Sequence, residues 1–222
     1  MPKPKDRPIS LALQGGGAHG AFAWGVLDRL IEEPRLKIKA ITATSAGAAN
    51  AVAFAAGLAQ DGEDGAKANL ERLWRTVSEK GAPFSAFSWS NSPLAALPFG
   101  PMHLAMAFTS IASPYEFNPF DINPLRDALD EAVDFDAVLG SPVKLFLSAT
   151  NVETGRVKIF QDEEITRDAV LASACLPQTF RAVEINGTCH AMPSESTILN
   201  WKRQCGKGFV MSPKMVKTVT HE

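Results

Sequence analysis

The sequence is poor in cysteine and has no excess of charge of either sign. Its 222 residues include three Cys, 22 Lys plus Arg and 24 Asp plus Glu, for a net charge of −2. Three scattered cysteines are too few for a disulfide framework or a zinc knuckle, so we expect a reducing compartment and no bound metal. Without the basic excess that binds polyanions, a nucleic-acid partner is not expected.

Long apolar runs are also missing. No stretch reaches the ~18 uninterrupted apolar residues of a spanning helix, so none is predicted. The N-terminus leads into a short strand-like run, residues 9–14, which is too brief for the apolar region of a signal peptide. We therefore predict a cytoplasmic protein.

What is present is a composition typical of a globular domain, with 45% apolar and 21% charged residues. Apolar periodicity predicts strands and helices that alternate in the first third of the chain and again after residue 143. This alternation indicates an α/β fold on a mainly parallel sheet. The predicted strands are 9–14, 38–44, 144–150 and 157–160, and the predicted helices are 18–32, 47–58, 66–80, 124–133 and 166–174.

One segment breaks the pattern, because residues 81–115 contain no Asp, Glu, Lys or Arg. Its repeated prolines exclude one long helix. Two interpretations stay open. The segment is either a buried insertion or an apolar cap that contacts greasy substrates or a membrane surface.

A glycine-rich turn follows the first predicted strand and precedes a helix. It reads Gly15-Gly16-Gly17-Ala18-His19-Gly20. Consecutive glycines allow several backbone N–H groups to point at one spot, which binds either a pyrophosphate or an oxyanion. A dinucleotide site also needs an acidic residue about 20 positions later, and residues 34–44 contain none. A nucleotide-binding domain that uses Gly15–Gly20 is therefore the weaker interpretation.

A serine lies at the next strand-to-helix junction, between small residues. The sequence there is Ala43-Thr44-Ser45-Ala46-Gly47. This is the pattern of a nucleophile elbow, in which small neighbours permit a sharp turn that exposes the hydroxyl, although the usual first glycine is Ala43. The alternative is an ordinary N-cap serine.

Together these motifs resemble the patatin-like phospholipase family. Two further segments support the resemblance, Ser173-Ala174-Cys175-Leu176-Pro177 and residues 180–187. The resemblance implies a lipid acyl hydrolase with a three-layer α/β/α fold and a Ser–Asp dyad, needing neither metal nor cofactor. Ser45 would be the nucleophile, and the amides of Gly15, Gly16 and Gly17 would form the oxyanion hole. His19 occupies a place where the family more often has Arg or Lys.

The second dyad residue is not found. The resemblance places an Asp roughly 15 residues after Pro177, within an Asp-Gly-Gly or Asp-Gly-Ala motif, but no Asp follows Asp168. Glu195 and His190 are weaker candidates for the missing base. We predict a family domain at residues 9–187 and an unmatched basic tail at 188–222. The hypothesis is that the family fold is C-terminally incomplete, through truncation or a frameshift after residue 187.

The sequence therefore predicts a serine hydrolase of phospholipid or other fatty-acyl esters, impaired by the missing Asp. Residues 81–115 would provide peripheral membrane contact. The alternative is a catalytically dead lipid-binding pseudoenzyme.

Overall fold

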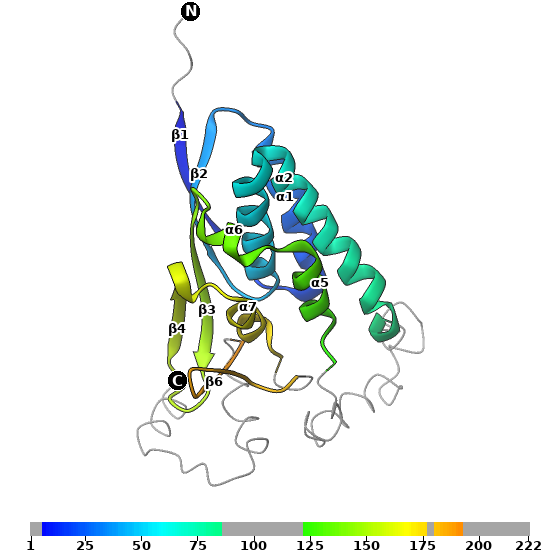
Figure 1. Ribbon diagram of the computed structural model, residues 1–222, viewed down its shortest axis with the longest axis vertical. Helices are drawn as coiled ribbons and strands as arrows, with labels where there is room; N and C mark the ends of the chain where they lie inside the picture. The colour runs from blue at the N-terminus through cyan, green and yellow to red at the C-terminus, as the bar shows by residue number, and fades with distance from the viewer. Residues whose placement is uncertain (1–5, 86–121, 177–179, 193–222) are drawn as a thin grey trace, which may run out of the picture.

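The computed structural model describes residues 6–85, 122–176 and 180–192 (Figure 1). Most of the uncharged segment, residues 86–115, and the tail from residue 193 lie outside these ranges, as does Glu195. The predictions made for them stay predictions.

A six-stranded sheet forms the centre of the fold. Its strands are β1 (Arg7–Leu13), β2 (Leu36–Ala43), β3 (Lys144–Asn151), β4 (Val157–Gln161), β5 (Val183–Ile185) and β6 (Thr188–Ala191). β1, β2 and β3 run parallel, whereas β4 and β6 pair antiparallel with β3, and β5 pairs antiparallel with β6. The parallel β1–β2–β3 centre and its helical connections confirm the predicted α/β class.

The described helices lie on one face of this sheet (Figure 1). They are α1 (Gly20–Ile31), α2 (Ala46–Ser85), α5 (Pro124–Ala132), α6 (Phe135–Leu139) and α7 (Arg167–Ala174), with short 3-10 turns η1 (Gly17–His19) and η3 (Asp162–Glu164). Right-handed crossovers place α1 and α2 on the same face, and α5, α6 and α7 all contact α2. The described residues thus provide the sheet and one of the two helical layers that the resemblance implies.

The main core lies between this helical layer and the sheet. Ile41, Leu147 and Phe160 point toward the helices and are at most 2% exposed. On the other face, the exposed side chains of β4 include Val157 and Ile159. The alternation along β4 has the two-residue period expected of a strand with one covered face.

Two predicted helices, 47–58 and 66–80, are joined into the single element α2. The chain stays helical on either side of a break at Asp61 and Gly62, where Gly62 has a φ of +64°. The segment between the two predicted helices is therefore a kink within α2. Both helices extend closer to Asp61 and Gly62 than their predicted ends at residues 58 and 66.

The predicted domain boundary at residue 187 lies within a β-hairpin. Asn186 and Gly187 form its turn with φ values of +53° and +75°, the conformation that Asn-Gly turns favour. β6 then pairs with both β5 and β3. Residues 188–191 are therefore part of the sheet and not of a separate tail, a correction to the sequence-based boundary.

Within the described residues, no helix is both long and apolar enough to cross a membrane.

Candidate active site

Ser45 lies in a strained turn between β2 and α2. Its φ is +56°, a left-handed conformation that non-glycine residues rarely adopt. The turn is closed by hydrogen bonds from the Gly47 amide to the Thr44 carbonyl at 3.0 Å and from the Ala48 amide to the Ser45 carbonyl at 2.8 Å. An ordinary N-cap residue has β-region torsions. The backbone of Ser45 thus differs from that of an ordinary N-cap residue, and it lies at the positive end of α2.

The glycine loop lies directly against this serine. A Cβ atom at Gly15 would be 2.8 Å from the Cβ and 3.5 Å from the Oγ of Ser45, so only glycine fits there. Gly47 has the same requirement, since a Cβ at that position would lie 2.3 Å from the carbonyl oxygen of Leu13. The two sequence motifs are therefore one structural unit.

Two amides of this loop have no hydrogen-bond partner among the described residues and so remain available to an anion. Among the described residues, the amides of Gly15 and Gly16 donate no hydrogen bond. Gly17 follows with a φ of +56° and begins η1, which leads directly into α1. His19 stabilises this turn, because its Nδ1 donates a hydrogen bond to the Gly16 carbonyl at 3.2 Å. A backbone nest before a helix can stabilise developing negative charge.

Ser173 anchors the elbow from a distant part of the sequence. Its hydroxyl accepts a hydrogen bond from the amide of Ser45 at 2.9 Å and donates to the carbonyl of Ser148 at 2.8 Å. The hydroxyl of Ser148 in turn bonds the hydroxyl of Thr44. Ser173 is completely buried in α7. From the sequence, Ser173 could be named only as part of a family motif. The structure shows which groups its side chain contacts.

Asn50 ties the glycine loop to α2. Its Nδ2 donates to the Gly20 carbonyl at 2.9 Å, and its Oδ1 accepts from the indole N–H of Trp74 at 2.8 Å. Asn50 is completely buried, so both hydrogen bonds replace contacts with water. Sequence reasoning missed this pair. The only available signal was a polar residue in the alanine-rich run that follows Ser45.

Within the described residues, no general base lies in hydrogen-bond contact with the serine. Among the described residues, no carboxylate or imidazole hydrogen-bonds to Ser45. The position roughly 15 residues after Pro177 is Met192, whose amide donates to the carbonyl of Cys175 at 3.0 Å. The β5–β6 hairpin thus brings this position to the end of α7, close in sequence to Ser173.

His190, one of the two candidate substitutes, has a different environment. It is 5% exposed, its Nδ1 donates to the Thr188 carbonyl at 2.9 Å, and its ring meets Phe160 edge-on at 5.4 Å. Burial lowers the pKa of this imidazole, which favours its neutral form. These contacts are those of a core histidine.

A metal centre is not formed by the described residues, which contain no group of three or more His, Cys, Asp or Glu able to hold an ion.

The patatin-like phospholipase family matches residues 11–193. Among solved structures, VipD from Legionella pneumophila matches with a TM-score of 0.41 and 16% identity. The match covers 86% of this chain but only 46% of the VipD chain, so this chain spans less than half of that protein's length. No curated protein matches.

Replacing Ser173 tests the anchoring of the elbow. We expect Ser173→Ala to lower the free energy of unfolding by about 1–3 kcal/mol, because the Ser45 amide and the Ser148 carbonyl lose their partner in a buried place. Ser10→Ala, at an exposed residue of β1, is the control and should change stability by less than about 0.5 kcal/mol. Urea unfolding measures both. Equal stabilities would show that the anchor has no energetic role.

The Asn50–Trp74 pair is tested by a double-mutant cycle. Asn50→Leu leaves the Gly20 carbonyl and the Trp74 indole unpaired and should cost about 1–3 kcal/mol for each group. Trp74→Phe removes one of these groups, so the double variant should be less destabilised than the sum of the single variants. Additive effects in urea unfolding would contradict the described network.

Proposed function

Because the chain belongs to the patatin-like phospholipase family, we propose that it is a serine hydrolase of lipid esters with Ser45 as its nucleophile. The single observation that carries the proposal is the contact between the left-handed Ser45 and the backbone of Gly15. Attack by a hydroxyl needs an oxyanion site beside it, and the close approach of Gly15 to Ser45 supports the glycine loop as that site.

In this mechanism Ser45 Oγ attacks the carbonyl carbon of a fatty-acyl ester. The amides of Gly15, Gly16 and Gly17 stabilise the negative charge that develops on the carbonyl oxygen. The alcohol leaves with a proton, and water then releases the acyl group from Ser45. The amide of Ser45 is already bonded to Ser173, so the oxyanion donors come from the glycine loop.

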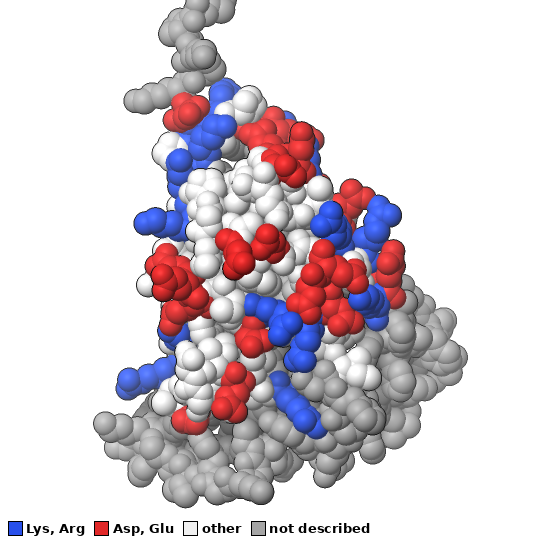
Figure 2. Space-filling model, viewed as in Figure 1, with Lys and Arg blue, Asp and Glu red and all other residues white. Residues whose placement is uncertain are grey.

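Apolar surface near the loop suits an acyl substrate. Phe22 and Val26, on the first turns of α1, are 79% and 41% exposed. On the face shown in Figure 2, much uncharged surface lies between scattered clusters of acidic and basic side chains. We propose that residues 81–115 add further contact with acyl chains or with a membrane, and that the protein acts in the cytoplasm.

The lack of a base beside Ser45 among the described residues sets the expected rate. A positioned general base contributes roughly 10²- to 10⁴-fold, so acylation of Ser45 in this chain should be slow. The second candidate function, a lipid-binding pseudoenzyme, is favoured by the absence of a carboxylate beside Ser45 among the described residues.

Covalent labelling distinguishes these two functions. We expect a fluorophosphonate probe to label the wild-type chain and not Ser45→Ala, since only an activated serine reacts. Ser10→Ala serves as the control and should label like the wild type. Equal labelling of the wild type and Ser45→Ala would refute Ser45 as the nucleophile, and no labelling of either would favour the pseudoenzyme.

Restoring a carboxylate at Met192 tests the cause of slow turnover. If this position corresponds to the dyad Asp, Met192→Asp should raise the hydrolysis of a fatty-acyl ester by about 10²-fold or more. Asn has nearly the same shape as Asp but cannot act as a base, so Met192→Asn should give no increase in the rate of hydrolysis. Folded Met192→Asp protein with an unchanged rate would show that position 192 is not the site of the base.

A further inference from the structure

The glycine loop meets the elbow at Gly20, the first residue of α1. Gly20 is buried, and a Cβ atom there would lie 2.6 Å from the Cβ of Ala46 and 2.7 Å from the Cζ2 of Trp74. No side chain fits into this contact. Because Ala46 directly follows Ser45 in the chain, the packing of Gly20 sets the position of the loop relative to the serine.

Asn50 holds Gly20 by its carbonyl group. The Nδ2 of Asn50 donates to the Gly20 carbonyl at 2.9 Å. Asn50 lies four residues after Ala46 on α2, and residues with this spacing share one face of a helix. One face of α2 therefore meets Gly20 at two points.

Trp74 fixes the direction of the Asn50 amide group. An indole N–H can only donate a hydrogen bond, so the oxygen of the amide group must face it, and Oδ1 accepts from the Trp74 indole at 2.8 Å. This bond turns the Nδ2 of Asn50 toward Gly20. The Trp74 ring also packs against Gly20, so Trp74 acts on the loop both directly and through Asn50.

The Asn50–Trp74 pair defines a geometry that apolar packing would not. Asn50 is completely buried, and its neighbours in this part of α2 are mostly buried alanines. Apolar groups in place of both partners of a buried hydrogen bond can leave stability nearly unchanged, so burial alone does not require the pair. Apolar contacts have no direction, whereas a hydrogen bond has a preferred length and angle. The pair therefore gives Gly20 a defined position against α2.

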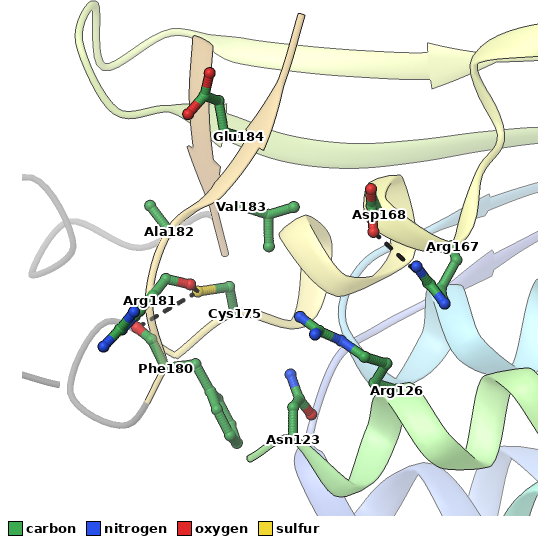
Figure 3. A pocket seen from close by; sticks show the side chains of 10 residues that line it. All are labelled: Asn123, Arg126, Arg167, Asp168, Cys175, Phe180, Arg181, Ala182, Val183 and Glu184. Carbon is green, nitrogen blue, oxygen red and sulfur yellow. Dashed lines mark hydrogen bonds and ion pairs between the residues drawn. The ribbon is translucent and has the colours of Figure 1, made fainter. Parts of the chain in front are cut away.

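The pair does not serve the cavity beyond α7. This cavity, of about 310 Å³, lies between the start of α5, α7 and the segment that leads into β5 (Figure 3). Gly20, Asn50 and Trp74 are not among its lining residues. Their contacts act on the glycine loop and not on this cavity.

We propose that Asn50 and Trp74 are positioning residues for the reaction of Ser45, because they hold the glycine loop at the separation from Ser45 at which its amides meet the oxyanion. The inference rests on the proposed function and deepens it. Neither residue needs to touch the substrate. A displacement of about 1 Å in an active site can lower the rate by about 10²-fold, so a small shift of Gly20 would be enough to slow the attack.

The test measures fluorophosphonate labelling of the full chain at several probe concentrations, which separates the maximal rate constant, kinact, from the apparent affinity, KI. We expect Asn50→Leu to lower kinact at least 10-fold and to change KI by less than about 3-fold, since the probe still finds the same surface. Trp74→Phe keeps the bond from Asn50 to Gly20 and should lie between this variant and the wild type. Thermal unfolding checks that each variant is folded.

Thr76→Val is the matched control for loss of stability. Thr76 is also buried on α2, but its hydroxyl bonds a carboxylate oxygen of Glu131 on α5 at 2.8 Å. The variant loses a hydrogen bond of the same helix that faces α5 and not the loop, so its kinact should equal that of the wild type. An equal fall of kinact in Thr76→Val and Asn50→Leu would overturn the positioning role, because a general loss of stability would then explain both.

A second measurement does not depend on the reactivity of Ser45. Amide hydrogen exchange of residues 14–21 reports local opening of the loop, and it should be at least 10-fold faster in Asn50→Leu and unchanged in Thr76→Val. If Asn50→Leu does not fold, Trp74→Phe takes its place in both measurements.

The two measurements separate this proposal from the proposed function. Labelling of the wild type with an unchanged kinact in the folded Asn50→Leu variant would overturn the positioning role and leave Ser45 as the nucleophile. No labelling of the wild type would refute the proposed function, and exchange would then decide alone whether the pair holds the loop. Faster exchange in Asn50→Leu only would support that hold, and equal exchange in all variants would overturn it.

Discussion

The backbone of Ser45 is the constraint on which the candidate site depends. A left-handed φ at a residue with a side chain costs of order 1–3 kcal/mol, so surrounding contacts must hold it in place. Ser173 bonds its amide, and the first amides of α2 bond its carbonyl. Gly15 packs against its side chain with no room for a Cβ. The left-handed backbone of Ser45 is therefore held by contacts from the loop after β1, from α2 and from α7.

In the proposed mechanism, this arrangement supplies one half of an acyl-transfer site. The serine, the helix end and the glycine amides are assembled by backbone geometry, which tolerates change in the surrounding side chains. A base depends on a single side chain at a single position. The β5–β6 hairpin that would present that position is formed, with the Met192 amide bonded to the Cys175 carbonyl, and a Met side chain cannot act as a base.

Much of the architecture could be predicted from the sequence. Strands β1 to β4 and the helices after β1 and β2 follow from apolar periodicity, which reports local burial. The β5–β6 hairpin was not predicted, because strands of three and four residues have too short a pattern. Its Asn186-Gly187 turn was the available signal. His190 was a chemical candidate in the sequence, and only its contact with Phe160 identifies it as a core residue.

By itself, the sequence determined the local chemistry, namely a glycine loop, a serine at a tight junction and no Asp after Asp168. Only the tertiary structure decided which distant groups meet. Asn50 reaches Gly20 and Trp74, and Ser173 reaches Ser45, because buried polar atoms must find partners wherever packing places them. Such pairings leave no periodic trace in a sequence, since they depend on how helices and strands pack and not on their spacing along the chain.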